Sequence, residues 1–162
     1  MSDFYIRELN AVNDSELLFE IVKHENVVFE EASVGNWNIK PFAKYGKVFA
    51  MLHKKNGNEK LVSVIEILRS FDGSKAYLYG VSAVPEYEKQ GHTRKLLKYV
   101  VDYLEENNIH TIELTVSISN ERAVKIYKKM GFKIAEKLQN EYGDNEERYM
   151  MKYEKHPIKI IV

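Results

Sequence analysis

KAYLYGVSAVPEYEKQGHTRKLLKYVVDYLEENN, residues 75–108, is the stretch that decides the fold. Residues 75–84 have the composition of a strand, Pro85 opens a turn, and Gly91 lies in a short polar loop. Apolar residues then recur with helical spacing on one face: Leu96, Leu97, Val100, Val101 and Leu104. A strand, a glycine loop and a helix N-terminus in this order present unpaired N–H groups and the positive end of a helix dipole, which suits a phosphate.

The amino-acid sequence of this loop resembles a motif of a known family. Residues 84–97 (VPEYEKQGHTRKLL) resemble motif A of the GNAT-type N-acetyltransferase superfamily, in which the amides of R/Q-x-x-G-x-G/A wrap the pyrophosphate of coenzyme A. Two positions depart from the pattern, with Glu88 in place of Arg or Gln and Thr93 in place of Gly or Ala. Residues 116–132 (VSISNERAVKIYKKMGF) resemble motif B of the same family. The two motifs imply an acyl-CoA-dependent N-acetyltransferase that moves the acetyl group of acetyl-CoA directly to a primary amine.

The predicted fold class is α/β (α+β): a mixed, largely antiparallel, twisted sheet of six to seven strands, GNAT-like. Strands are expected at residues 4–9, 47–54, 61–70, 75–84, 111–117, 132–140 and 147–154. Asn56-Gly57 and Asp72-Gly73 predict tight turns. The helix between the strands at 75–84 and 111–117 makes a βαβ unit, so those two strands should be parallel.

Two further helices complete the predicted fold, one starting after Asn13 and one at residues 121–130, so that helices lie on both faces of the sheet. Asn13 and Glu16 are the expected N-cap pair of the first of them. Residues 26–42 predict a short helix or an ordered loop. We expect one domain over residues 1–154 and a tail over 155–162, which either adds an edge strand, reaches a second subunit or lies on its own surface.

The whole-chain composition excludes several classes of protein. Lys plus Arg and Asp plus Glu both number 24, so charge predicts neither a nucleic-acid nor a membrane-surface partner. No apolar run reaches the ~18 residues of a membrane span, and no secretory leader pattern is present. Cysteine is absent, and the five histidines lack H-x-x-x-H or H-x-H spacing, so no metal site is expected. These features favour a cytoplasmic location.

The resemblance assigns a set of residues to acetyl-CoA: Val81, Ala83, Gln90, Gly91, His92, Thr93 and Asn120. Lys89 and Arg94 are further candidates for contact with the phosphates, the alternative being an ordinary solvated helix start. The amides at 90–93 are the pyrophosphate candidates, and the backbone at 81 and 83 would pair with the pantetheine arm and polarise the acetyl carbonyl. A Glu88 carboxylate ~6 Å from a phosphate would repel it by almost 3 kcal/mol at a dielectric of ~20, and by less than ~1 kcal/mol in water. We therefore expect the Glu88 side chain to point into solvent.

Tyr127 matches the general acid that the family usually provides for the departing thiolate. A tyrosine of pKa ~10 donating to a thiolate whose acid has pKa ~8.5 works uphill by about 2 kcal/mol, so a hydrogen bond alone could suffice. The alternative is a core position, because Tyr127 shares an apolar helical face with Ala123, Ile126 and Met130. Asn120 is expected to cap this helix and is a candidate contact to the pantetheine.

The general base is left open by the sequence. Some family members carry a glutamate at the position that aligns with Tyr77, and that carboxylate is missing here. Tyr79 alternates onto the face of Tyr77 and is a candidate proton relay. Glu66 on the neighbouring strand is a second candidate base, the alternative being a glutamate at the rim with no role.

The acceptor amine is not identified by the sequence. Glu30, Glu31 and Trp37 fall in the region that borders the acceptor cleft in such enzymes, and carboxylates with an aromatic face suit a cationic amine. An ordinary acidic surface loop is the alternative. A small molecule, a peptide or a protein all remain as partners, and a homodimer is one state that the resemblance implies.

Rival functions are weaker. Gly80-Val-Ser-Ala-Val84 lacks the last glycine of a G-x-S-x-G nucleophile elbow. Lys125, Lys128 and Lys129 fit a solvated helix face better than a nucleic-acid site. The serious rival is a coenzyme-A-binding sensor or regulatory module without catalysis, which the departures at Glu88, Thr93 and Tyr77 would favour.

Overall fold

The fold is described from a computed structural model covering residues 3–143 and 145–155. Its strands are β1 Phe4–Glu8, β2 Lys47–Lys55, β3 Asn58–Arg69, β4 Lys75–Ala83, β5 Thr111–Ser117, β6 Lys133–Gln139 and β7 Glu147–Glu154. Its α-helices are α1 Ser15–Val28, α2 Ile39–Tyr45, α3 His92–Glu106 and α4 Glu121–Lys129, and its short 3-10 helices are η1 Glu30–Ala32 and η2 Pro85–Tyr87. Every predicted strand is present, and η1 and α2 resolve the segment whose structure the sequence left open.

The sheet is mixed and largely antiparallel, as expected, with one parallel pair and the strand order β1-β2-β3-β4-β5-β7-β6. The pairs β1–β2, β2–β3, β5–β7 and β6–β7 are antiparallel. By its contacts the chain forms two compact units, Met1–Leu68 with Leu78–Val100, and Arg69–Tyr77 with Val101–Val162. One domain over residues 1–154 stays a prediction, and residues 156–162 of the predicted tail lie outside the described residues.

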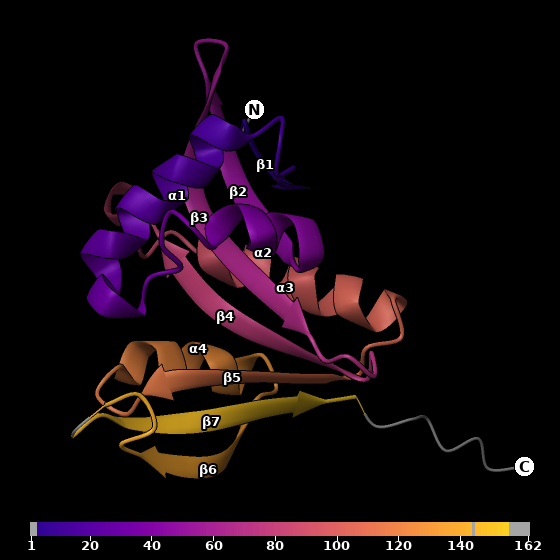
Figure 1. The fold of residues 1–162 in the computed structure, drawn as a ribbon, viewed down its shortest axis with the longest axis vertical. Helices are drawn as coiled ribbons and strands as arrows, with labels where there is room; N and C mark the ends of the chain where they lie inside the picture. Colours follow the sequence, from indigo (N-terminus) through magenta and orange to yellow (C-terminus); the bar gives the residue numbers. More distant parts are fainter. Residues whose placement is uncertain (1–2, 144, 156–162) are drawn as a thin grey trace, which may run out of the picture. The chain divides into compact units, whose positions relative to one another are not determined.

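In the first unit, alternation along β2 covers both faces of the strand. Val48, Ala50 and Leu52 join one buried cluster with apolar residues of α1 and α2, among them Leu18, Ile21 and Ile39. Phe49, between them, turns the other way and meets Tyr99 of α3, with ring centroids 5.6 Å apart. Figure 1 shows this arrangement, with α1 and α2 in front of β2 and β3 and α3 behind. The prediction of helices on both faces is confirmed in this unit.

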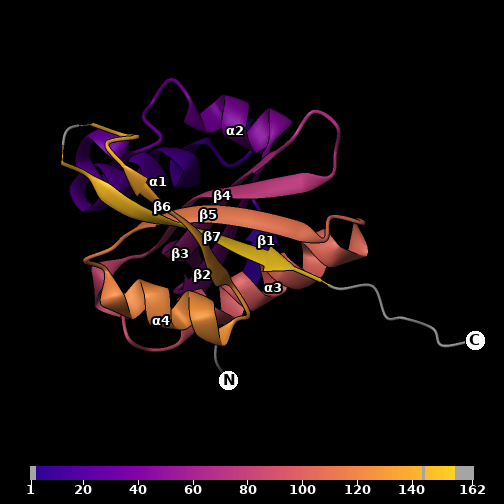
Figure 2. The ribbon, with the colours of Figure 1, turned by 90° about the horizontal axis from the view of Figure 1, so that it is seen from below.

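In the second unit, β7 lies between β5 and β6, as Figures 1 and 2 both show. Leu114 of β5 pairs with Met151 of β7, and both side chains are buried. The α4 helix packs through Tyr127, whose ring lies 5.9 Å from that of Phe132. Phe132 in turn lies 5.5 Å from the ring of Tyr153 on β7. This packing holds α4 against the strands of its own unit.

One local prediction is wrong. Asp14 rather than Asn13 is the N-cap residue of α1, and it makes no capping hydrogen bond with its side chain. Both Asp14 carboxylate oxygens accept instead from the guanidinium of Arg7 on β1, at 2.8 and 2.9 Å. The tertiary ion pair has taken the oxygens that a local cap would use.

Candidate active site

The loop between β4 and α3 has the backbone geometry of an anion site. The first backbone bond of α3 runs from the Lys95 N–H to the Gly91 carbonyl, at 3.1 Å. The amides from Gly91 to Arg94 precede this bond, and such groups have no partner inside a helix. Gly91 has a φ of +83°, and a Cβ placed there would meet nothing within 4 Å, so the space in front of the loop is open. Glycine is required by the backbone, and the loop fits a diphosphate.

The side chains of this loop are mostly exposed. Glu88, Lys89, Gln90 and Arg94 are exposed, and Thr93 is half-buried. Lys89 has a φ of +60°, so two left-handed residues lie two positions apart and turn the chain sharply into the helix. The exposure of Glu88 confirms that its carboxylate points into solvent. His92 is the exception, since it is buried and its ring stacks on Phe4 with centroids 4.3 Å apart.

β4 carries the other predicted cofactor residues. Val81 and Ala83 are half-buried and lie three residues and one residue, respectively, before Val84, whose N–H donates to Val62 O at 2.9 Å. Tyr79 is partly exposed, and its hydroxyl donates to the carbonyl of Ala32 at 3.2 Å. The Tyr79 hydroxyl therefore contacts the connection between α1 and α2. Its service as a proton relay stays a prediction.

Glu66 is fully buried, which corrects the view of it as a glutamate at the rim. A second carboxyl, that of Glu25 on α1, is equally buried and lies beside it. A Cβ placed on Gly80 of β4 would come within 2.4 Å of Glu66 Oε2 and 3.2 Å of Glu25 Oε1. Burial and the neighbouring Glu25 carboxyl raise the pKa of Glu66 well above its usual value.

The predicted acceptor residues lie together in sequence and are all exposed. Glu30 and Glu31 belong to η1, and Trp37 lies just before α2 with 92% of its side chain exposed. Glu30 has a φ of +51°, an uncommon backbone for a residue with a side chain. Their position at the connection between α1 and α2 is consistent with a binding border but does not by itself assign an amine.

In the second unit, Tyr127 is buried, with 7% of its side chain exposed. Burial raises the pKa of Tyr127 above its ordinary value, and the positive charge of Arg148 opposes part of that rise. The phenol is therefore protonated at neutral pH and is better suited to donating a hydrogen bond than to giving up its proton. Asn120 caps α4 as predicted, with Oδ1 accepting from the Ala123 N–H at 3.2 Å.

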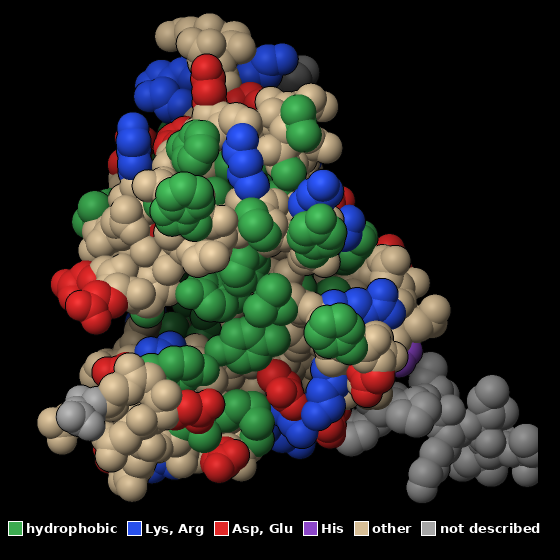
Figure 3. All heavy atoms as spheres, in the orientation of Figure 1, with side chains coloured by type: hydrophobic (Ala, Val, Ile, Leu, Met, Phe, Trp, Pro, Cys, Tyr) green, Lys and Arg blue, Asp and Glu red, His purple; other side chains and the backbone are tan. Residues whose placement is uncertain are grey.

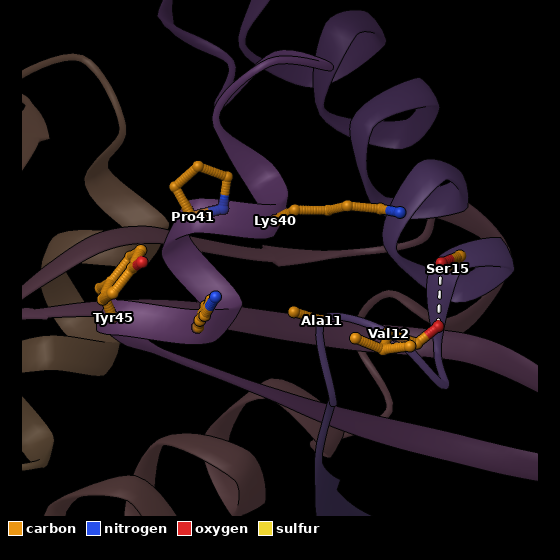
Figure 4. A pocket seen from close by; sticks show the side chains of 7 residues that line it. Ala11, Val12, Ser15, Lys40, Pro41 and Tyr45 are labelled. Atoms are coloured by element: carbon orange, nitrogen blue, oxygen red, sulfur yellow. Dashed lines mark hydrogen bonds between the residues drawn. The ribbon is translucent and has the colours of Figure 1, made fainter.

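Two surface hollows lie in the first unit. The larger, ≈ 640 Å³, adjoins the predicted cofactor loop through Gln90 and His92 and is otherwise lined by Phe4, Tyr5, Ile6, Met51, Lys95 and Tyr99. The smaller, ≈ 380 Å³, lies between the start of α1 and α2 and is lined by Ala11, Val12, Ser15, Lys40, Pro41, Lys44 and Tyr45 (Figure 4). None of the predicted site residues lines the smaller one. Figure 3 shows exposed hydrophobic side chains over α1 and α2. The exposed large hydrophobic residues of these helices include Phe19 and Tyr45.

The comparison with known families decides the class of this protein. A model of the acetyltransferase (GNAT) family matches residues 16–132, which is most of the chain. The chain belongs to the GNAT acetyltransferase family. A GNAT relative, the [ribosomal protein bS18]-alanine N-acetyltransferase of Escherichia coli (strain K12), is 34% identical over 74 residues, 46% of this chain and 50% of that protein. The N-alpha-acetyltransferase of Sulfurisphaera tokodaii is 31% identical over 78 residues, which are 48% of this chain and 47% of that protein.

Solved GNAT-like structures share the fold over nearly the whole length. Ard1 from Thermoplasma volcanium superposes with a TM-score of 0.80 at 18% identity, covering 96% of this chain and 99% of that one. Spermidine N-acetyltransferase from Vibrio cholerae, in complex with CoA and spermine, superposes with a TM-score of 0.73 at 20% identity. The match covers 94% of this chain and 95% of that one. In sequence, the chain spans about half the length of the curated relatives it matches.

Glu25 was not predicted as a site residue, although its position in the sequence indicates that it is buried. Leu17, Leu18, Ile21 and Val22 set the buried face of α1, and Glu25 takes the next position on that face. A second missed contact is His24, whose Nε2 lies 3.0 Å from Ser82 Oγ of β4. Burial lowers the pKa of His24, so its imidazole is predominantly neutral at pH 7.

Among the described residues, no cluster of three or more His, Cys, Asp or Glu could hold a metal ion. No helix in this part of the chain is long and apolar enough to cross a membrane.

Proposed function

We propose that this GNAT protein is an N-acetyltransferase that uses acetyl-CoA to acetylate a primary amine. The observation that carries the proposal is the N-terminus of α3, where the amides from Gly91 to Arg94 precede the first helical bond and a Cβ placed on Gly91 would meet nothing within 4 Å. Acetyl-CoA supplies an acetyl group already activated as a thioester. The chain has to bind the diphosphate, orient the acetyl carbonyl and assist the departing thiol.

Binding falls to the loop at 88–94. The amides of Gln90, Gly91, His92 and Thr93 would donate to the diphosphate, aided by the positive end of the α3 dipole and by the exposed cations Lys89 and Arg94. The backbone of Val81 and Ala83 would hold the pantetheine arm and donate to the carbonyl oxygen, which gains negative charge during transfer. Asn120 Oδ1 is occupied as a helix cap, so its amide nitrogen is the group left for a cofactor contact.

Tyr127 would donate its hydroxyl proton in a hydrogen bond to the departing sulfur. The raised pKa of this phenol increases the cost of full proton transfer, so stabilisation by the hydrogen bond is the role that fits the burial. Tyr79 is the residue we assign to removal of the amine proton, which it would relay through its hydroxyl. Glu66 is fully buried and its pKa is raised, so it does not fit the role of base. Glu30, Glu31 and Trp37 would attract a cationic amine to the border of the site.

An amine panel tests the proposal. Acetyl-CoA would be incubated with the protein and with a peptide bearing an N-terminal alanine, a lysine-containing peptide with a blocked N-terminus, spermidine and free amino acids. We expect free thiol and acetylated amine to form in equal amounts with at least one class, measured by thiol titration and mass spectrometry. Peptides with a free N-terminus are the first choice, because two relatives are named for acetylating alanine or N-alpha amines.

A heat-denatured sample and a Tyr127→Phe variant serve as controls in the same assay. Binding of acetyl-CoA by calorimetry without turnover on any amine would favour the sensor module instead. Absence of binding would contradict both functions.

A further inference from the structure

Two carboxyl groups of the first unit are buried without enough hydrogen-bond donors. Glu25 on α1 and Glu66 on β3 both have 0% of their surface exposed. Glu25 Oε2 accepts from the Val34 N–H at 3.1 Å. For Glu25 Oε1 and both oxygens of Glu66, residues 3–143 and 145–155 offer no donor while both groups are ionised. Two adjacent charges in such a place would repel strongly and remain unsolvated.

One proton resolves this arrangement. A proton on Glu66 converts one of its oxygens into a donor that the Glu25 carboxylate can accept, and it also removes one of the two charges. Asp and Glu pairs that share a proton are known to behave in this way when two carboxyl groups occupy one site. The buried pair then carries a single negative charge, which the Val34 amide helps to stabilise.

Space for the pair is made by a glycine. Gly80 occupies the middle of β4, where glycine weakens a strand, and its φ is not in the left-handed region that would demand glycine. The reason for glycine here is close approach, because any Cβ would collide with Glu66 Oε2 at 2.4 Å. The carboxyl pair therefore lies directly against the backbone next to Val81, the residue assigned to the acetyl carbonyl.

The pair also anchors the segment between α1 and α2. Val34 is bound by Glu25, and two residues earlier the Ala32 carbonyl accepts from Tyr79 of β4. The ring of Tyr79 also lies 4.9 Å from that of Phe42 on α2. These contacts connect the segment that carries Glu30, Glu31 and Trp37 to the centre of β4.

We propose that Glu25 and Glu66 share one proton and that this protonated pair positions residues 29–38 for acceptor binding. This positioning role rests on the proposed acetyltransferase function, whereas the shared proton and the anchoring of the segment do not. Loss of the proton would place two charges behind Gly80 and weaken the Glu25–Val34 anchor. The segment should then loosen, and the acceptor KM should rise while acetyl-CoA binding changes little.

Other titratable groups near the pair are few. From α1, His24 faces β4 and contacts Ser82, with its pKa lowered by burial and raised in part by the charges of Glu25 and Glu88. β4 contributes the phenol of Tyr79, which contacts the Ala32 carbonyl. The connection between α1 and α2 contributes the Val34 amide, which does not titrate.

The single tryptophan of the chain provides a direct probe, because Trp37 lies in the anchored segment. In wild type we expect its fluorescence anisotropy to fall as pH is raised and the pair loses its proton, because the two charges then weaken the Glu25–Val34 anchor. Glu66→Gln keeps a donor for Glu25 and cannot ionise, so its anisotropy should stay high and flat. Glu25→Ala should give low anisotropy throughout. Glu16→Gln, an exposed change on the same helix, is the matched control and should follow wild type.

Carbon NMR of wild-type protein with labelled glutamates measures the protonation of the carboxyl groups directly and needs no variant. One carboxyl is expected to remain protonated at pH 7, and its loss should coincide with the change in Trp37. Once an acceptor is known, its KM should rise by about tenfold over the same pH range in wild type and not in Glu66→Gln, a size typical of coupled equilibria. Carboxyls that are all ionised at pH 7, or identical anisotropy curves for wild type and Glu66→Gln, would overturn the proposal whether or not the protein turns over an amine.

Discussion

Tyr127 is buried, and replacing it by phenylalanine removes one oxygen and little packing. Tyr127→Phe is expected to lower kcat by one to several orders of magnitude, because the departing thiolate would lose the hydrogen bond that stabilises its charge. The dissociation constant of acetyl-CoA should be nearly unchanged, because the diphosphate is assigned to the loop at 88–94. Steady-state kinetics with calorimetry would separate the two quantities. Unchanged turnover would make Tyr127 a core residue only.

The contact between Gly80 and the carboxyl pair can be tested through stability. Gly80→Ala should lower the free energy of unfolding by about 1–3 kcal/mol, the usual cost of overpacking, because its Cβ meets Glu66 Oε2 at 2.4 Å. The same change should cost clearly less in a Glu66→Ala background, where that oxygen is gone. Urea unfolding of the four proteins measures the coupling. Equal costs in both backgrounds would show that the strand has moved away from the pair.

At single residues the sequence was informative where the role is local and less so where partners come from distant elements. Asn120 could be predicted as a cap because its acceptor and the Ala123 donor are three residues apart. Glu25 and Glu66 belong to α1 and β3, and no spacing rule relates them. Each did occupy an apolar position, on a helical face and in a buried strand. A charge at such a position is the signal that would have led to the pair.

Among elements, the loop between β4 and α3 carries two of the departures from the family pattern, Glu88 and Thr93. Glu88 is exposed, so its repulsion of a bound diphosphate is that of a solvated charge, about 0.7 kcal/mol at ~6 Å in water. Glu88→Gln should therefore tighten acetyl-CoA binding about threefold at low salt, and the gain should shrink as salt is added. Calorimetry at two ionic strengths measures it. Glu16→Gln is the remote control, and a gain of the same size there would remove Glu88 from the site.

The bounds of most elements followed from local chemistry. β5 begins at Thr111 and ends at Ser117 as predicted, because alternation and the flanking polar residues define it. The turn after β2 has positive φ angles at Asn56 and Gly57, the backbone that Asn-Gly favours. The start of α1 was misplaced because Arg7, from a strand, competes for Asp14. Local rules fail where a tertiary ion pair claims the same atoms.

Across the whole molecule, an ion-pair network at one end of the first unit links three elements. Arg7 of β1 binds Asp14 before α1 and Glu59 of β3, each at 2.8 Å. The Arg7 guanidinium lowers the pKa of Asp14 from 3.8 and that of Glu59 from 4.5. These carboxylates therefore contribute stability above those values, and the contribution is lost as pH falls through the lower values of the folded state.

Arg7→Met should remove this dependence of stability on pH in the acid range. The free energy of unfolding is expected to drop by about 1 kcal/mol near pH 7, a modest amount because the pair is partly exposed. As pH falls below the ordinary carboxyl values of 3.8 and 4.5 the wild type and the variant should converge gradually, and the difference should vanish below the lowered pKa values of the folded state, since protonated carboxyls no longer gain from Arg7. Urea unfolding at several pH values would show it. A constant difference down to pH 2 would mean that Arg7 acts through packing alone.

The central claim is that main-chain donors around Gly91 bind the diphosphate of acetyl-CoA, and amide NMR measures it most directly. On titration with acetyl-CoA, the largest shifts are expected at the N–H groups of Gly91, His92 and Thr93, and inorganic pyrophosphate should move the same signals less. Saturable binding that leaves these amides unmoved, or no binding at all, would contradict the account.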